Sequence, residues 1–582
     1  MKRPLVALFL GVLAGCAAAP KPQPVSVPPR PVHVVIVGTT DVHGAFAGRT
    51  ETLKDGRTLH SGGLAILGGY LAALRAANPG RVIVVDSGDL FQGSLESNLF
   101  EGEPVVRAYN ELGYAAAAVG NHEFDYGPLG PEAVASRPGE DPLGALEKNA
   151  ATAKFPFLSA NMVEKATGKT PAWARRSTVV RAGAATIGII GLSTPDTPNV
   201  TMAANVASLS FTDPVQATVD EAARLRGEGV DAVVVVGHMG GRCTDLEDVN
   251  DVASCDGDQE AMRFLRALPS GTIDAYFGGH THQQMRQVIN GVPAVQAAAY
   301  SQAFATIDLW IDPVAHRALA QRDEIRSNTM LCEVVWSGTT TCDPKRGAAG
   351  AQLVPRTYEG RTITGDAAVA SLLRPYIEKT AAKKVEPTGI RTAETFGRQY
   401  RRESQLGDLL ADALRDATGA DMAVMNSGGI RANLREGDLV YNDIFELSPF
   451  DNYLAVVAMT GAQIVEVLNL TTVGGGRGIL QVSGLRYAFE DALPPGHRVT
   501  AVTLPNGKPL VPEALYRVAM PDFLSAGGDG LQPVMSRIPP DRIVLDQSRP
   551  LRDIFVQTLA KWPMPIAPKP LDRITTDAKA SE

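Results

Sequence analysis

The sequence has few of the features that mark repeat proteins, nucleic-acid-binding proteins or membrane-spanning proteins. No internal repeat is evident, and after the first 16 residues no apolar run is long enough to cross a bilayer. A net charge of -8 gives little support for binding a phosphate backbone, so we expect no polymeric nucleic acid partner. With 582 residues, 45% hydrophobic and 20% charged, the chain is instead typical of a globular protein with more than one domain.

Cysteine and histidine are also scarce, with 5 and 9 residues respectively. One cysteine, Cys16, ends a short apolar run at residues 5–13 that follows Lys2 and Arg3. The run is too short for a mature membrane helix and reads as a signal peptide. Its end, Leu-Ala-Gly-Cys, resembles the bacterial lipobox, in which the chain is cut before a cysteine that becomes lipidated. The alternative is a plain signal peptide with a chance cysteine.

We therefore expect a signal peptide at residues 1–15, a lipid on Cys16 and a Pro/Ala-rich tether at residues 16–31. The protein would be exported and anchored to a bacterial membrane only through this lipid, facing the periplasm or the cell surface, and we expect a monomer. An even number of cysteines remains, which favours disulfides in an exported chain. Their local spacing predicts the pairs Cys243–Cys255 and Cys332–Cys342; metal ligation is the alternative, but neither spacing resembles a zinc knuckle.

Val/Ile-rich runs alternate with helical patterns in the first half of the chain. Strands are predicted at residues 33–37, 81–85, 186–190 and 232–236, and a helix at residues 64–77 that ends at Asn78-Pro79-Gly80. Continuous apolar strands separated by helices indicate an α/β fold with both sheet faces covered. A Gly/Thr/Pro-rich break at residues 328–355 precedes a helix at residues 366–384 and a second α/β region that begins near Gly389. The Pro-rich tail from Trp562 onward we expect to be ordered only in part.

Five polar clusters stand out, and most of them come directly after a predicted strand. They contain five of the nine histidines and are Asp41-Val42-His43-Gly44, Asp86-Ser87-Gly88-Asp89, Gly120-Asn121-His122-Glu123-Phe124-Asp125, Gly237-His238 and Gly279-His280-Thr281-His282. Each one alone is a weak signal, because a single loop histidine is common. Together they supply carboxylate, imidazole and amide ligands, which suit divalent manganese, zinc, cobalt or iron. One bridging Asp would hold two ions ~3.5–4 Å apart, and such a pair can activate water for in-line attack on a phosphate.

In order and spacing, these clusters resemble the signature of calcineurin-like metallophosphoesterases. The run Asn121-His122-Glu123-Phe124-Asp125-Tyr126-Gly127 is similar to the 5'-nucleotidase branch, which includes bacterial UDP-sugar hydrolases and animal ecto-5'-nucleotidase. The resemblance implies a four-layer β-sandwich flanked by helices at residues 32–365, a connecting helix at residues 366–388, a second α/β substrate-binding domain at residues 389–560 and a tail at residues 561–582.

The resemblance also implies roles for individual residues. Asp41, His43 and His282 would bind one metal, Asn121, His238 and His280 the other, and Asp89 would bridge them. Position 282 is Gln or Asn in some relatives. His122, oriented by Asp125, would stabilise the transition state or protonate the leaving oxygen.

The second half contains three stretches that resemble the substrate-binding segments of the same family. They are Asn426-Ser427-Gly428-Gly429-Ile430-Arg431, Ser448-Pro449-Phe450-Asp451-Asn452 and residues 522–530, which contain Phe523 and Asp529. By resemblance, Asn426, Gly428, Gly429, Arg431 and Asp529 would contact the substrate, and Phe450 and Phe523 would stack on the base from loops. One departure is Tyr400, which stands where the family usually has a substrate-binding Arg; Arg398, Arg401 or Arg402 would have to substitute for it.

The leading hypothesis is a dinuclear-metal phosphohydrolase that cleaves nucleoside 5'-monophosphates. The alternatives are a 2',3'-cyclic-nucleotide phosphodiesterase with 3'-nucleotidase activity and a UDP-sugar hydrolase, and more remotely a sulfur-oxidation hydrolase. A non-catalytic lipoprotein that binds nucleosides belongs to a different class, and the intact set of metal-type residues disfavours it.

Overall fold

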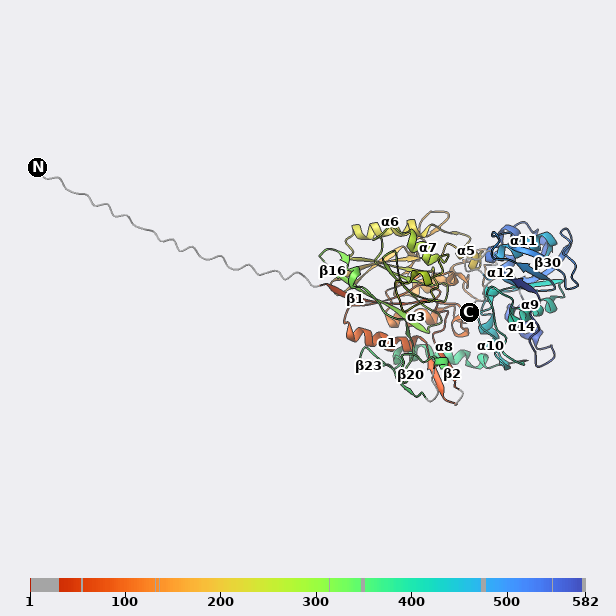
Figure 1. Cartoon of the computed structure of the whole chain (residues 1–582), viewed down its shortest axis with the longest axis horizontal. Helices are drawn as coiled ribbons and strands as arrows, with labels where there is room; N and C mark the ends of the chain where they lie inside the picture. The colour runs from red at the N-terminus through yellow and green to blue at the C-terminus, as the bar shows by residue number, and fades with distance from the viewer. Residues whose placement is uncertain are drawn as a thin grey trace.

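In a computed structural model, the chain forms two α/β units side by side (Figure 1). The structure describes residues 1, 31–53, 56–130, 132–135, 137–312, 314–346, 351–472, 478–546 and 548–577. The predicted signal peptide, Cys16 and nearly all of the tether lie outside the described residues. No helix among the described residues is long and apolar enough to cross a membrane.

The first unit is a sandwich of two sheets, as the resemblance implied. One sheet has the order β17-β16-β1-β4-β5-β6-β8, with β18 and β19 also paired to β16, and the other has the order β14-β15-β13-β12-β10-β9. The strands that lead to the predicted ligands are β1 (Val32–Thr39), β4 (Val82–Asp86), β5 (Ala116–Ala118), β12 (Ala232–Gly237) and β13 (Ala275–Gly278). β1, β4 and β5 run parallel in the first sheet, and β12 and β13 run parallel in the second.

The remaining strands extend the two sheets on either side of these central strands. They are β6 (Phe157–Leu158), β8 (Ala174–Arg175), β9 (Ser177–Ala182), β10 (Ala185–Leu192), β14 (Gln284–Ile289), β15 (Val292–Ala297), β16 (Ala303–Asp312), β17 (Arg317–Ala318), β18 (Glu324–Ile325) and β19 (Thr329–Met330). Outside the two sheets, β20 (Val334–Trp336) and β21 (Leu353–Pro355) form a small hairpin.

Three apolar layers hold the sandwich together. Val34, Ile36 and Val236 belong to the core between the two sheets. On the outside, α1 (Leu64–Ala77) and α3 (Glu103–Leu112) cover the first sheet, while α6 (Pro214–Gly227) and α7 (Glu260–Ala267) cover the second. The Val/Ile strands are buried on both faces because helices cover each sheet, which explains their continuous rather than alternating apolar pattern.

Helix α8 (Ala367–Lys384) links the two units. Its N-cap, Asp366, accepts hydrogen bonds from the N–H groups of Ala368 and Val369. The helix packs on α1, α2 (Leu95–Asn98) and α3 of the first unit and on α10 (Tyr441–Leu447) of the second. An ion pair between Lys384 and Glu96 ties its end to the first unit. The domain limits given by the sequence stay predictions.

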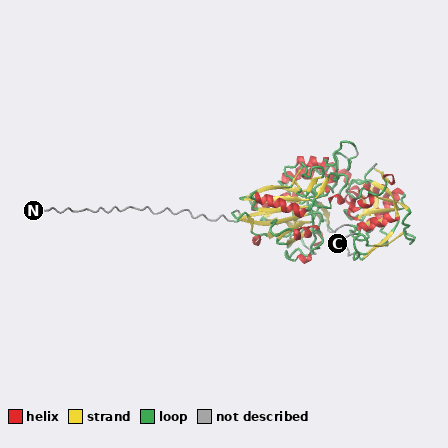
Figure 2. Ribbon diagram, turned by 90° about the horizontal axis from the view of Figure 1, so that it is seen from above, coloured by secondary structure: helices red, strands yellow, loops and turns green. Residues whose placement is uncertain are grey.

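The second unit also combines strands with helices (Figure 2). It contains a five-stranded sheet and a three-stranded sheet. The five-stranded sheet is β28 (Leu480–Ser483), β25 (Met422–Asn426), β31 (Leu515–Pro521), β27 (Leu454–Thr460) and β32 (Ile543–Asp546) in that order. Helices α9 (Gln405–Thr418), α11 (Gly461–Thr471) and α14 (Leu551–Leu559) lie in this unit. A separate two-stranded sheet consists of β24 (Pro387–Thr392), the first strand of this unit, and β26 (Gly437–Val440).

The tail contributes more structure than the sequence suggested. β33 (Ile574–Thr576) pairs in parallel with β29 (Arg486–Phe489), which also pairs with β30 (Val499–Thr503). The carboxylate of Glu403 accepts hydrogen bonds from the N–H groups of Asp572, Arg573 and Ile574. Proline-rich composition is a poor guide here, because a distant buried carboxylate and an open strand edge order the segment.

Candidate metal centre and substrate cleft

The predicted metal ligands meet at the carboxyl ends of the parallel strands. Asp41 and His43 follow β1, Asp89 follows β4, Asn121 follows β5, His238 follows β12, and His280 and His282 follow β13. Asp41, His43, Asp89 and His282 offer ligand atoms within 4.8 Å of one another, and so do Asp89, His238 and His280. Asp89 belongs to both groups, which is the position of a bridging ligand in a dinuclear site.

The backbone at this site is held in an unusual conformation. Five of the ligand residues, Asp41, His43, Asp89, His280 and His282, have φ between 49° and 76°. Residues with a Cβ adopt this left-handed region rarely, and such strain is typical of functional sites. Gly120 is required nearby, since a Cβ there would lie 2.2 Å from Oδ1 of Asp89. The tight approach of these loops explains the glycines in the motifs.

Ring orientation supports metal binding. Nδ1 of His43 donates to the carbonyl of Gln92 at 2.7 Å, and Nδ1 of His238 donates to the carbonyl of Ser87 at 2.8 Å. A carbonyl can only accept, so the proton of each neutral ring is on Nδ1 and Nε2 presents a lone pair. These Nε2 atoms point at other acceptors: His238 Nε2 lies 3.1 Å from Oδ1 of Asn121 and 3.1 Å from Oδ2 of Asp89.

Asp89 gives the test of whether these residues fit a cation. Its Oδ2 is buried and accepts no hydrogen bond within the part of the chain that the structure describes. Nε2 of His43 lies 3.7 Å from it, and Nε2 of His43 lies 2.9 Å from Nε2 of His282. A buried carboxylate oxygen with imidazole Nε2 atoms beside it needs a neighbouring positive charge, and a divalent ion would supply it. The donor set therefore fits two divalent ions.

Burial sets the charge of most of these rings. It lowers the pKa of His43 and His282 well below the ordinary value and that of His280 to about 3, which leaves neutral ligands. Burial also opposes the charge on His238, but Asp89 and other carboxylates outweigh it and raise its pKa to about 10. A divalent cation at Asp89 would take the place of that proton.

His122 and Asp125 form a pair beside the metal ligands. Nδ1 of His122 and Oδ2 of Asp125 are 2.6 Å apart, and the hydroxyl of Thr201 donates to the other Asp125 oxygen at 2.8 Å. Burial lowers the pKa of His122, but the carboxylates of Asp125 and Asp89 outweigh this and raise it overall. His122 is thus held by Asp125 at the edge of the candidate metal centre.

Sequence reasoning missed the role of Glu123. Its side chain is buried and accepts hydrogen bonds from the N–H groups of Asp89 (2.9 Å), Leu90 (2.6 Å) and Gly120 (2.7 Å). It therefore fixes the loop that carries the bridging carboxylate to the loop that carries Asn121. The signal was present in the motif, because a carboxylate next to Asn121 and His122 that binds no metal must have another function.

A cavity of about 1390 Å³ separates the two units and joins the remaining predicted residues. The metal-centre residues Asp89, Asn121, His122, Asp125, His280 and His282 line one side. All nine predicted substrate-binding residues line it from the second unit: Arg398, Arg401, Asn426, Gly428, Gly429, Arg431, Phe450, Phe523 and Asp529. The structure thus brings the two predicted halves of the site to one cleft.

Only one of the two aromatic residues departs from the expectation, because Phe450 lies in a loop as predicted and Phe523 does not. Phe523 lies in a single helical turn, α12 (Asp522–Ser525), rather than in a loop. Phe450 packs against His122, with ring centroids 5.5 Å apart, and under the guanidinium of Arg431 at 5.8 Å. Its ring therefore touches the first unit directly, which a loop assignment from sequence could not reveal.

Two of the basic residues that flank Tyr400, Arg398 and Arg401, line the cleft. Burial and the nearby charge of Arg431 lower the pKa of Arg398, and both arginines line the cleft. Arg401 instead pairs with Asp491 at 2.5 Å. Burial raises the pKa of Tyr400, and Asp529 adds to the shift. Arg398 is therefore the better placed of the predicted substitutes to meet an anion.

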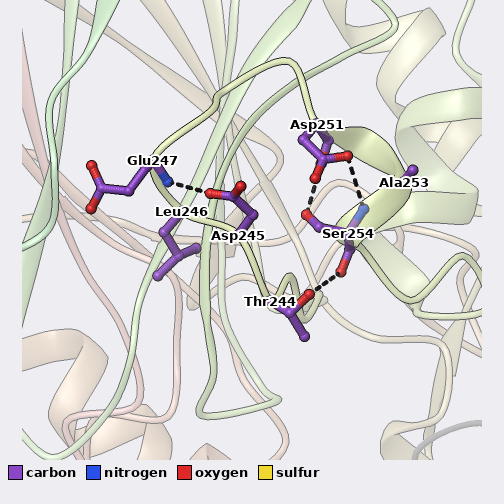
Figure 3. Close-up of a pocket in the computed structure, with 7 residues that line it drawn as sticks. All are labelled: Thr244, Asp245, Leu246, Glu247, Asp251, Ala253 and Ser254. Carbon is purple, nitrogen blue, oxygen red and sulfur yellow. Dashed lines mark hydrogen bonds between the residues drawn. The ribbon is translucent and has the colours of Figure 1, made fainter.

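Two disulfides are present, Cys243–Cys255 and Cys332–Cys342. The first closes a loop between β12 and α7 whose flanks, Arg242 and Asp256, line the cleft. The outer side of that loop has a hollow lined by acidic and small residues (Figure 3). There Asp245 accepts from the N–H of Glu247 and Asp251 from that of Ser254, so these carboxylates brace the loop.

Comparison with known proteins agrees with this architecture. Residues 34–284 match the family model of calcineurin-like phosphoesterases, and residues 382–537 match that of the 5'-nucleotidase C-terminal domain. A 5'-nucleotidase of Vibrio cholerae is 28% identical over 91% of both chains. Protein UshA of Escherichia coli is 28% identical over 78% of this chain and 79% of its own. The structure of a 5'-nucleotidase precursor from Thermus thermophilus superposes with a TM-score of 0.72 at 25% identity, covering 94% of this chain and 99% of that one.

The fold, the candidate dinuclear site and these matches define a metal-dependent phosphoester hydrolase of the calcineurin-like class. With its 5'-nucleotidase C-terminal domain, the chain belongs to the 5'-nucleotidase family.

Proposed function

We propose that this hydrolase cleaves nucleoside 5'-monophosphates to a nucleoside and phosphate. The observation that carries the proposal is the shared cleft, in which the candidate metal ligands face Asn426, Arg431, Phe450 and Phe523 of the other unit. A nucleotide has two ends of different chemistry, an anionic phosphate and an apolar, polarisable base, and the cleft offers a matching partner for each.

The residues divide the work. Asp41, His43 and His282 would hold one ion, Asn121, His238 and His280 the other, and Asp89 would bridge them. When bound, two such ions activate water and neutralise phosphate charge. Arg431 and Arg398 would orient the phosphate from the opposite wall, because a guanidinium can donate two parallel hydrogen bonds to it. His122, held by Asp125, would donate a proton to the leaving oxygen.

The size of the cleft leaves room for a larger substrate. At about 1390 Å³ the cavity exceeds the ~300–1,000 Å³ typical of small-molecule sites. A UDP-sugar or a 2',3'-cyclic nucleotide would use the same metals and base-binding residues. A nucleotide substrate rather than a nucleic acid polymer also agrees with the net charge of -8.

We also propose that the protein acts outside the cytoplasm as a monomer, anchored by a lipid on Cys16. The signal-like start of the sequence supports export. A similar chain in Listeria monocytogenes is named a cell wall protein, at 26% identity over 90% of this chain and 66% of its own.

The test compares a nucleotide with an ester that lacks a base. Phe450→Ala and Phe523→Ala should raise the KM for AMP about tenfold, since each aromatic contact with a base contributes ~1–3 kcal/mol. Neither change should greatly alter KM for p-nitrophenyl phosphate. Leu515→Ala is the control, because Leu515 is exposed in the same unit. Phe555→Ala is unsuitable, because Phe555 is a core residue. Equal losses on both esters would contradict a base-binding role, and phosphate release from UDP-glucose or a 2',3'-cyclic nucleotide in preference to AMP would redirect the assignment.

A further inference from the structure

Tyr300 lies in the loop between β15 and β16, outside every motif that predicts the site. Its backbone N–H donates to the carbonyl of Asp41 at 2.7 Å. Ala298, Tyr300 and Ser301 all have positive φ values, of 72°, 58° and 51°. Residues with a Cβ rarely adopt this conformation, so the loop is held in a strained shape against the first ligand group.

The ring of Tyr300 contacts two members of that group. Its centroid lies 5.2 Å from that of His282, with the planes at 87°, and 5.4 Å from that of His43. The guanidinium carbon of Arg49 lies over the Tyr300 ring, 5.7 Å from its centroid. Through its backbone and its ring, one residue therefore touches Asp41, His43 and His282.

The candidate ligand histidines are not held alike. His43 and His238 each donate from Nδ1 to a backbone carbonyl, and their side chains are 1% and 0% exposed. The His282 side chain is 20% exposed, and its Nδ1 has no hydrogen bond to any residue that the structure describes. A ligand histidine without an Nδ1 partner can turn about its side-chain bonds unless packing stops it.

We propose that Tyr300 is a positioning residue for the metal held by Asp41, His43 and His282. Its perpendicular ring limits the rotation of the His282 side chain by packing, whereas a carbonyl acceptor limits the rotation of His43 and of His238 by a hydrogen bond. The inference rests on the proposed two-metal site. Loss of the ring should weaken one ion selectively, within the ~10–100-fold range seen for outer-shell partners of metal ligands. The other ion is held by Asn121, His238 and His280, none of which has a ring contact with Tyr300 in the structure.

The experiment titrates the metal-free full chain with manganese by calorimetry and counts bound ions by mass spectrometry. The variants are Tyr300→Phe, which keeps the ring, and Tyr300→Leu, which removes it. Tyr358→Leu is the matched control, since Tyr358 is also half-buried in the first unit and makes edge-to-face contacts with Tyr70 and Phe304. We expect two ions at unchanged affinity in Tyr300→Phe and Tyr358→Leu, and one ion bound 10–100-fold more weakly in Tyr300→Leu. At saturating manganese, turnover of Tyr300→Leu should approach that of the wild type.

Other results would overturn the inference. Unchanged affinity for both ions in Tyr300→Leu, or equal weakening of both, would remove the selective role. A Tyr300→Phe variant as weak as Tyr300→Leu would assign the effect to the hydroxyl. Should Tyr300→Leu not fold, Tyr300→Met repeats the comparison with a flexible side chain, and loss of fold in both would make Tyr300 a core residue. If the wild type itself bound no manganese, zinc, cobalt or iron, the two-metal function would fail first.

Discussion

Nη2 of Arg431 lies 3.3 Å from Nε2 of His282 and 3.4 Å from Nε2 of His43. The arginine comes from the second unit and both histidines come from the first, so the structure shows the cleft with its two walls in contact. A guanidinium can only donate, hence both ring nitrogens face it with lone pairs, the form that binds a metal. With an ion on those nitrogens, two positive groups would be neighbours, and an anionic phosphate between them would stabilise both.

Removal of the bridging carboxylate should disable both halves of the metal centre. Asp89→Asn should bind fewer than two ions and lose activity on AMP and p-nitrophenyl phosphate alike, by more than the ~10–100-fold of an outer-shell change. Asp258→Asn, another carboxylate of the cleft, is the control.

Chelation should abolish wild-type activity, and manganese, cobalt or zinc should restore it. Full activity in exhaustively chelated protein would refute metal dependence.

Glu123 should matter through the loop that it holds. Glu123→Gln replaces an acceptor of three backbone hydrogen bonds by an amide whose nitrogen would face N–H groups. We expect ~10–100-fold weaker metal binding with the fold retained. Metal titration of the variant, with circular dichroism as the check on folding, measures this. Wild-type affinity would mean that the loop keeps its shape without the carboxylate.

His122 should contribute to turnover rather than to metal binding. His122→Ala should keep two ions and lose ~10²–10⁴-fold in kcat, the usual contribution of a positioned acid or base. Asp125→Asn should lose less, because the ring keeps its contact with Phe450. Steady-state kinetics beside metal analysis separates the two effects. A wild-type kcat in His122→Ala would end the catalytic assignment.

Asp408 should make stability depend on pH. Burial raises its pKa to about 8, opposed by Arg573 and reinforced by Glu403, from an ordinary value of 3.8. Since the folded pKa is the higher one, its stabilising contribution is full below pH 3.8 and is lost as pH rises through 8. Asp408→Asn cannot ionise, so its stability should gain on that of the wild type as pH rises from about 4 to about 8, by up to about 1.4 kcal/mol per pH unit, and the gain should level off above pH 8. A constant Tm difference across that range would contradict the shift.

Anchoring can be tested in cells. Cys16→Ser should release the protein from the membrane fraction, because no lipid can then be attached. Immunoblots of membrane and soluble fractions measure the distribution, with Cys243→Ser as a cysteine change outside the signal. Retention of the Cys16→Ser protein at the membrane would require a different anchor.

The sequence by itself determined most of the first unit. The strands at Val32–Thr39 and Ala232–Gly237 were predictable because buried parallel strands need continuous apolar runs, and helix Leu64–Ala77 because Asn-Pro-Gly stops a helix. The polar clusters after the strands indicated where a metal site could lie, and the resemblance to metallophosphoesterases implied which of their residues would bind metal. Each of these motifs spans only a few consecutive residues, so the sequence alone contains it.

Only the tertiary structure decided how distant segments meet. That Phe450 contacts His122, that Arg398 rather than Arg401 accompanies Arg431, and that Tyr300 packs on His282 depend on where two separately folded units and a strained loop come to lie. Glu403 orders the tail for the same reason, because its carboxylate reaches N–H groups about 170 residues away in sequence. Local patterns specify which side chains can do chemistry. Contacts between remote segments come from the packing of whole sheets and helices, and no single motif encodes that packing.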